Sequence, residues 1–187
     1  MKTKGIITCI IAVLAVVIIW LLIGQIKNED GLIEVVIPVN LLGGETTEKF
    51  YHGYLTDFEY QKLVTDVRVN DEDSITLVLT TDQLTEYKQN MYNYGMFDGN
   101  NDSIKNVTYE NKLLTRITVL VHSDKYEHNV FEKTMCNSVL AAYAGMYQVL
   151  SGIPPDEWST TITIKDDDTD EIISVTEFPN DDMYRVY

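Results

Sequence analysis

Cysteine is scarce in this sequence, and its two cysteines lie in different chemical settings. Cys9 is inside a long apolar run near the N-terminus, and Cys136 is far into the polar remainder of the chain. A long apolar run of this kind is typical of a membrane segment. A residue inside a membrane cannot form a disulfide with a residue of a water-exposed domain, so Cys9 and Cys136 cannot pair within one folded chain. The sequence therefore excludes a disulfide-stapled domain and leaves a hydrophobic core as the source of stability.

Basic residues are also scarce. The chain has 14 Lys and Arg against 29 Asp and Glu, which gives a formal net charge of −15 at pH 7. Nucleic acid phosphates and anionic lipid surfaces repel such a chain, so we exclude a nucleic-acid role. We interpret the charge as support for solubility, and the alternatives are cation binding or a basic partner.

Catalytic motifs are the third absence. An α/β-hydrolase places its serine in Gly-x-Ser-x-Gly, and neither Ser123 nor Ser138 has these neighbours. His122, Asp124 and His128 are close in sequence, but no Cys or His pair completes a four-ligand zinc set. We therefore expect surface histidines in a loop. A cell-envelope hydrolase that uses a His/Asp pair in this segment is the alternative function.

Against these absences stands one long apolar run. Residues 6–23 contain no charge, and Thr8 is their only polar residue. Such a run rises about 27 Å as a helix, close to the hydrocarbon thickness of a bilayer. It therefore predicts a transmembrane anchor. Residues spread along this anchor are Ile6, Leu14, Trp20 and Ile23.

Two other interpretations of the run are weaker. A helix that is apolar all round needs a large domain to surround it, and the rest of this chain is too small. A cleaved signal peptide has an apolar region of about 7–15 residues before a small-residue cleavage site. This run is longer and ends in Leu22-Ile23-Gly24-Gln25. Cys9 lies near the start of the run, where a lipoprotein signal does not place its cysteine.

Charges around the run set its orientation. Lys2 and Lys4 precede it without an acidic neighbour, whereas Lys27 is followed at once by Glu29 and Asp30. The positive-inside rule therefore places the N-terminus in the cytoplasm and the remainder outside. The sequence predicts a single-pass cell-membrane protein in three parts: a cytoplasmic tip and anchor at 1–24, a short tether at 25–31, and an extracytoplasmic domain at 32–187.

Apolar periodicity predicts strands and two main helices in this domain. One helix begins at the Thr80–Gln83 capping box, and another begins at Asn129. A third, less regular helix is expected between residues 46 and 60. Strands are expected at Leu32–Ile37, Leu63–Val69, Ile75–Leu79, Leu113–Val121, Ser159–Ile164 and Glu171–Phe178.

The helix that begins at Asn129 shows the clearest apolar stripe. Its members are Phe131, Met135, Val139, Ala142, Met146 and Leu150, widened by Cys136, Leu140, Tyr143 and Tyr147. Cys136 on this stripe predicts a buried, inert thiol. Hairpins mixed with two good helices predict an α+β domain of two layers: a mostly antiparallel sheet with the two main helices on one face.

Four stretches form a pattern over most of residues 31–179. They are Ile33–Pro38, Ser74–Thr80 leading into a helix, Tyr147–Gly152, and the acidic last hairpin ending at Pro179. In this pattern the chain resembles a loose group of uncharacterised extracytoplasmic proteins of Gram-positive bacteria, many with a lipoprotein signal or an N-terminal anchor. The chain departs from the group because it lacks a lipobox. The resemblance implies a cell-envelope location and a similar fold, and it carries over no site residue.

One acidic segment has the spacing of a calcium loop. Asp166, Asp168 and Asp170 occupy the first, third and fifth positions, and Glu177 occupies the twelfth. Glu171 stands at the sixth position, where the sharp turn needs glycine, and the flanks have strand patterns. The segment is therefore a hypothesis for a Ca²⁺ site, with a solvated hairpin turn as its alternative.

Tyrosine is abundant, with twelve residues in the chain. Exposed tyrosines form binding surfaces for peptides or glycans, since aromatic anchors dominate interfaces. We therefore predict a membrane-anchored extracytoplasmic binding or interaction module whose partner is an envelope protein or a glycan. Tyrosines on or beside the two helices are Tyr87, Tyr92, Tyr94, Tyr143 and Tyr147.

Overall fold

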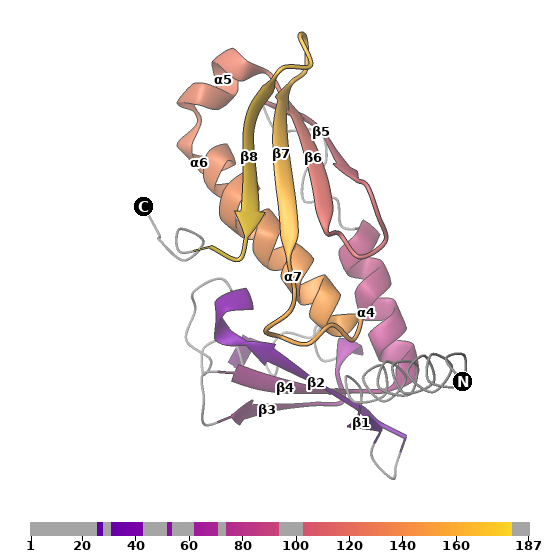
Figure 1. Ribbon diagram of the computed structural model, residues 1–187. Helices are drawn as coiled ribbons and strands as arrows, with labels where there is room; N and C mark the ends of the chain where they lie inside the picture. The colour runs from indigo at the N-terminus through magenta and orange to yellow at the C-terminus, as the bar shows by residue number, and fades with distance from the viewer. Residues whose placement is uncertain are drawn as a thin grey trace, which may run out of the picture.

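The computed structural model describes residues 26–27, 31–42, 52–53, 62–70, 74–93 and 103–180. These residues form an α+β domain with two separate β-sheets and helices packed against them (Figure 1). No helix within these ranges is long and apolar enough to cross a membrane. The predicted anchor at 6–23, most of the helix expected between 46 and 60, and Tyr94 all lie outside the described residues.

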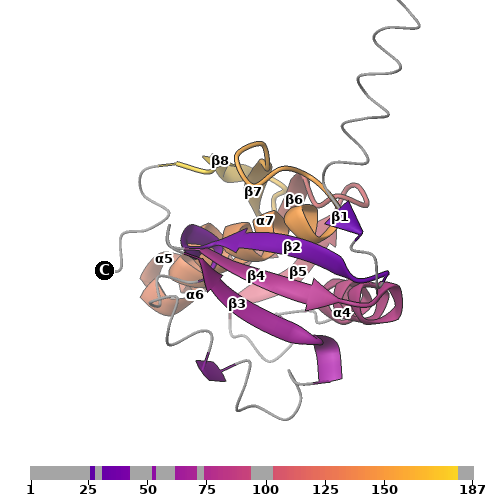
Figure 2. The same ribbon diagram turned by 90° about the horizontal axis from the view of Figure 1, so that it is seen from below.

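The first sheet consists of β1 (Ile26–Lys27), β2 (Ile33–Pro38), β3 (Asp66–Asn70) and β4 (Ser74–Leu79). Its strands are antiparallel and lie in the order β1-β2-β4-β3, as Figure 2 shows from below. The hairpin predicted from alternation is confirmed, with Val67 opposite Leu77. The interior strand β4 is buried on both faces, whereas Val69 on the edge strand β3 is 48% exposed.

Helix α4 (Thr81–Asn93) follows β4 directly, and the capping box predicted at its start is confirmed. The Thr80 N–H donates to Gln83 Oε1 at 2.9 Å, and the Gln83 N–H donates to Thr80 Oγ1 at 3.1 Å. Both residues of the box thus satisfy an N–H at the start of the helix. Leu84, Tyr87 and Met91 are buried, which fixes the face that α4 turns toward the core.

The second sheet consists of β5 (Ile104–Tyr109), β6 (Arg116–Val121), β7 (Thr160–Asp166) and β8 (Ile172–Phe178), in that order. β6 and β7 are parallel neighbours, with Ile117 opposite Ile162. The prediction of a single sheet is therefore wrong, whereas the predicted mostly antiparallel pairing holds, because among the described strand pairs only β6 with β7 is parallel. The chain builds two sheets, and the second is mixed because the helical segment between β6 and β7 provides the crossover that parallel strands need.

Strand β5 was not predicted from the sequence. Its pairing with β6 is irregular between Ile104 and Asn106, where the register shifts. Such a shift interrupts the alternation of apolar and polar side chains from which a strand is predicted. The strand predicted at Leu113–Val121 is shorter in the structure, because Leu114 adopts a left-handed conformation with φ of 56°.

The crossover from β6 to β7 is mostly helical from Ser123 to Leu150 and irregular from there to β7. It contains α5 (Ser123–His128), α6 (Val130–Thr134), the π-helical turn η2 (Met135–Val139) and α7 (Leu140–Leu150). The loop expected around His128 is therefore wrong, because this segment is α5. The predicted helix start at Asn129 is confirmed: its Oδ1 accepts a hydrogen bond from the Glu132 N–H at 3.1 Å.

The π-helical turn explains why part of the predicted stripe is wrong. Phe131 is 69% exposed and Val139 is 37% exposed, whereas Cys136 and Leu140 are fully buried. A π turn closes hydrogen bonds one residue further along the chain than an α turn. The buried face before and after it therefore does not follow one constant period of 3.6 residues.

Helix α7 connects the two sheets. It contacts β7 of the second sheet, and it also contacts β2 and the short helix η1 (Val39–Leu41). Figure 1 shows it passing behind the second sheet and reaching the first. A Cβ atom added at Gly145 would lie 2.7 Å from Leu41 Cδ2 and 2.7 Å from Trp158 Cδ2. The missing side chain of Gly145 therefore sets how closely α7 approaches these neighbours.

The C-terminal end of α7 is fixed by backbone and side-chain hydrogen bonds. The Gly152 N–H donates to Val149 O, and the Ile153 N–H donates to Gln148 O, both at 3.0 Å. This is a Schellman cap, and Gly152 has the positive φ of 92° that the cap needs. The buried amide of Gln148 also donates to Ser159 O at 2.8 Å and accepts from the Ser159 N–H at 3.2 Å, which holds the chain entering β7.

Candidate functional site

His122 lies where β6 ends and α5 begins, and its backbone is fully engaged. Its N–H donates to Ser103 O at 2.8 Å, which extends the pairing of β5 with β6. Its carbonyl accepts from the N–H groups of Lys125 at 3.1 Å and Tyr126 at 2.9 Å, the first turn of α5. The backbone of His122 is therefore fixed by both the sheet and the helix.

Asp166 anchors the β7–β8 turn against the same region. Its Oδ1 accepts from the backbone N–H groups of Asp168 at 3.0 Å and Thr169 at 2.8 Å, and from the Thr169 hydroxyl. Its Oδ2 accepts from the Ser123 N–H at 3.3 Å. Hydrogen bonds from Ser123 and Thr169 hold the pKa of Asp166 well below its usual range.

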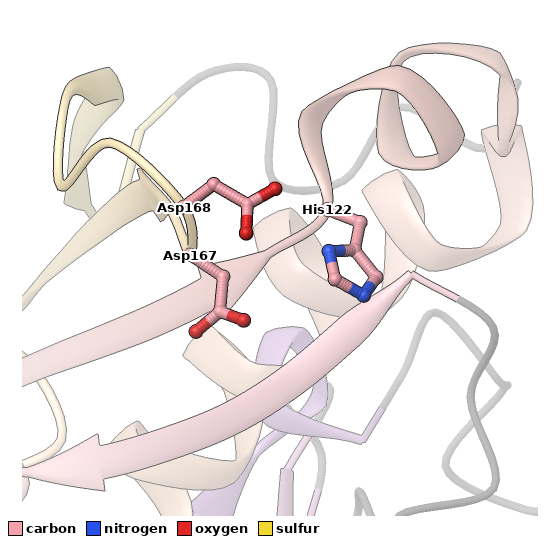
Figure 3. A group of neighbouring side chains, drawn as sticks. All are labelled: His122, Asp167 and Asp168. Carbon is pink, nitrogen blue, oxygen red and sulfur yellow. The ribbon is translucent and has the colours of Figure 1, made fainter.

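The turn places two exposed carboxylates beside His122. One ligand atom from each of His122, Asp167 and Asp168 lies within 4.8 Å of the other two, and Figure 3 shows the three side chains turned toward one another. The Asp167 N–H donates to Val121 O at 2.9 Å, which joins the turn to the end of β6. A half-buried imidazole and two exposed carboxylates thus come together from two connections at one end of the second sheet.

This group differs from the predicted calcium loop. Of its three aspartates only Asp168 belongs to the group. Asp166 directs its oxygens to the hydrogen bonds that hold the turn, and Asp170 forms an ion pair with Lys165 at 3.0 Å. The calcium loop stays a prediction, and the described geometry gives Asp166 and Asp170 other partners.

The predicted His/Asp segment is also divided by the fold. His122 joins the two carboxylates of the turn, whereas Asp124 and His128 are exposed on α5 and do not belong to the group. Asp167 was missed by sequence reasoning. The parallel register that sets Val121 opposite Asp166 brings it near His122, and no local pattern predicts that register.

The burial predicted for Cys136 is confirmed. Cys136 is fully buried, and burial raises the pKa of its thiol to about 12. Burial also raises the pKa of Tyr126, whose hydroxyl is hydrogen-bonded to this thiol. Because the thiolate is the reactive form of cysteine, this raised pKa disfavours reaction of the Cys136 thiol at neutral pH.

Several of the predicted tyrosines form one aromatic cluster. The ring of Tyr92 on α4 lies 5.9 Å from that of Tyr109 on β5 and 6.1 Å from that of Tyr147 on α7. The Lys88 ammonium lies 5.8 Å from the centroid of the Tyr147 ring. The cluster joins α4 to β5 and α7. Tyr87, also on α4, is buried in the core.

The second surface feature is the edge strand β8. Ile172 is 61% exposed, Ile173 is 44% exposed and Val175 is 56% exposed. The strand forms one end of the second sheet, with only β7 as its neighbour among the described strands. An edge with exposed apolar side chains offers backbone hydrogen bonds and side-chain contacts to another extended chain.

The other described edges carry devices that discourage such pairing. β1 is only two residues long. β3 has Arg68 in an ion pair with Glu34, and β5 has Lys105 at its register shift. Short length, charge and irregular pairing all blunt an edge. Residues 172–178 contain neither Lys, Arg nor Pro, and their only charge is Glu177. The pairing of β8 with β7 also shifts register between Ile164 and Lys165, so β8 shares this one device with β5.

Comparisons with protein-family models, curated proteins and solved structures found no match. The resemblance to extracytoplasmic Gram-positive proteins therefore stays a prediction, and the functional argument rests on the residues of this chain.

Proposed function

We propose that this chain is a membrane-anchored extracytoplasmic module that binds an extended, basic segment of an envelope protein along β8. The observation that carries the proposal is the exposure of Ile172, Ile173 and Val175 on an edge strand without Lys, Arg or Pro. In this binding mode, main-chain hydrogen bonds supply affinity, and alternate side chains supply specificity.

Acidic residues beside β8 favour a basic partner. Asp167, Asp168 and Glu171 lie exposed at the start of the strand, and Glu177 is exposed near its end. Lysine or arginine residues on both sides of an apolar segment would complement these carboxylates. A second copy of the chain fits less well, because each copy has a formal net charge of −15 and edge-to-edge pairing would bring carboxylates together.

The proposed location rests on the apolar run at 6–23 and on the lysines before it. The structure adds the position of β1, in which Ile26 and Lys27 pair with Glu34 and Ile33. Part of the predicted tether is therefore a strand. A domain whose first strand begins so soon after the run would lie close to the bilayer.

The binding proposal is tested with the full chain in detergent micelles and a fluorescein-labelled peptide, Lys-Lys-Val-Thr-Val-Thr-Val-Lys-Lys. Fluorescence anisotropy should show saturable binding that weakens as salt is added. Val175→Lys gives β8 the charge that blunts other edges and should weaken binding at least about tenfold, or 1.4 kcal/mol. The matched control is Val69→Lys on β3, which should bind like the unchanged chain.

Two control peptides separate strand pairing from charge. The same peptide with alternate backbone nitrogens methylated keeps its charge but cannot complete a ladder, so it should not bind. The version with glutamates in place of the lysines should bind weakly. Equal binding of the methylated peptide, or equal loss in Val69→Lys and Val175→Lys, would overturn the proposal.

The location is tested separately by adding a protease to intact cells. Residues 25–187 should be degraded without lysis, whereas an epitope added before Lys2 should survive until the cells are opened. Protection of the domain in intact cells would show that the orientation is reversed or that the chain is not exported.

A further inference from the structure

We propose that His122, Asp167 and Asp168 bind a divalent cation of the zinc class. Imidazole nitrogen and carboxylate oxygen are ligands of zinc, at about 2.0–2.2 Å from the ion. The three ligand atoms already lie within 4.8 Å of one another, and both aspartates are exposed. Rotation of these side chains is enough to bring the atoms onto one ion.

The backbone at the site needs no rearrangement to present the ligands. His122 is fixed by Ser103 and the first turn of α5, as described above. Asp167 is held by Val121 O at 2.9 Å, and Asp168 by Asp166 Oδ1 at 3.0 Å. Ion binding would therefore order only side chains, which keeps the conformational cost low.

Ser103 lies beside His122 across the strand pair and has a buried hydroxyl. It is fully buried, and no described residue forms a hydrogen bond with its hydroxyl. The hydrogen bond from His122 to Ser103 O continues the register in which Ile104 faces Val121, so Ser103 and His122 are directly opposite. Opposite residues of an antiparallel pair have side chains on the same face, so the Ser103 hydroxyl lies on the side of the His122 ring.

A buried hydroxyl without a partner costs about 1–3 kcal/mol. The Ser103 hydroxyl has no surface that a water molecule can touch, so a water on the cation would reach it only after its side chain turned. Three protein ligands leave the fourth position of a tetrahedral zinc ion for such a water.

The donor set distinguishes zinc from calcium. Calcium takes six to eight oxygen ligands, whereas this site offers one nitrogen and two carboxylates. Two carboxylates also neutralise one divalent ion. The bound ion would join the β7–β8 turn to the junction of β6 with α5, two connections that are distant in the sequence.

The test uses the full chain in detergent micelles, freed of metal by chelation, with zinc titrated against a chromophoric chelator. His122→Ala and Asp168→Asn should each weaken zinc binding at least about tenfold. The matched controls are His128→Ala, the exposed histidine of α5, and Asp170→Asn, which is in the same turn but pairs with Lys165. Both controls should keep the affinity of the unchanged chain.

Two further measurements complete the test. Circular dichroism checks that every variant keeps its fold, and Asp168→Asn decides the outcome if His122→Ala does not fold, because Asp168 is exposed. Absence of zinc binding at millimolar ion, or the same affinity in Asp168→Asn and Asp170→Asn, overturns the proposal. Calcium binding that depends on Asp170 and not on His122 would also overturn it, in favour of the calcium loop. Peptide binding along β8 is measured without zinc, so the two proposals fail separately.

Discussion

The α7 packing site, where Gly145 approaches Leu41 and Trp158, and the edge strand β8 use apolar side chains in opposite ways. At the α7 packing site, Trp158 is 3% exposed, and Leu140 of α7 is fully buried. On β8, in contrast, Ile172 is 61% exposed and Val175 is 56% exposed. Apolar area removed from water stabilises a fold, and exposed apolar area does not. The difference separates residues that hold the domain together from residues available to a partner.

The largest expected loss of stability comes from a change at the α7 packing site. Trp158→Ala removes a buried aromatic ring that packs against Gly145, and we expect a loss of about 3–5 kcal/mol in the free energy of unfolding. Phe131→Ala removes an aromatic ring that is 69% exposed and should change stability by less than about 0.5 kcal/mol. Urea denaturation of the full chain in micelles measures both. Equal losses would show that α6 is covered in solution.

A smaller loss of stability is expected from adding a side chain at the α7 packing site. Gly145→Ala adds a Cβ 2.7 Å from Leu41 Cδ2, and such overpacking costs about 1–3 kcal/mol. Alanine otherwise favours a helix over glycine by about 1 kcal/mol, so a net loss would report the clash and not the helix. The control is Gly53→Ala, whose Cβ would have no neighbour within 4 Å. A gain in stability at Gly145 would contradict the close approach of α7.

Alkaline pH is expected to weaken the buried region and leave β8 unaffected. Burial raises the pKa of the Cys136 thiol from 9.0 to about 12, and burial also raises the pKa of Tyr126 and Tyr143. The folded chain therefore keeps protons that the unfolded chain loses. Stability is fully present below pH 9 and should fall as the pH rises from 9 toward 12.

Urea midpoints at several pH values measure this fall. The Cys9→Ala chain gives a second measurement, because its only thiol is Cys136. This thiol should react with a disulfide reagent only after unfolding. Rapid reaction of the folded chain at pH 8 would contradict the burial of Cys136.

The smallest expected effect is on β8 itself. Val175→Thr keeps a β-branched side chain at an exposed position and should change the free energy of unfolding by less than about 0.5 kcal/mol. The matched change Ile164→Val, on the neighbouring strand and fully buried in the sheet, should cost about 0.5–1.5 kcal/mol. A larger cost at Val175 than at Ile164 would show that β8 contributes to the core and weaken the case for a binding edge.

Local signals predicted much of this fold. The capping box at Thr80 and Gln83, the cap at Asn129 and the hairpin of β7 with β8 were readable because each depends on residues near in sequence. The parallel pairing of β6 with β7 could not be predicted, because the sequence of each strand does not determine which strand lies beside it in the sheet. The π-helical turn could not be predicted either, because no particular residue type marks the place where it changes the helical period.

The candidate cation group shows the same limit. His122 and Asp168 were both singled out from the sequence, but as members of two different sites. Only the register of Val121 with Asp166 brings them together. The exposure of β8 was also out of reach, because alternation does not reveal which strand of a sheet lies at its edge.

The position of β8 also decides which strand is open while the chain folds. β6 and β7 are joined by a long crossover, which parallel strands need, whereas β7 and β8 are joined by a short turn. Until residues 172–178 pair, β7 presents the free edge. β8 is then the strand that an intruding copy of the same segment could replace most easily. Exchange of this strand between two chains is therefore the expected route to misassembly, and a low chain concentration would protect against it.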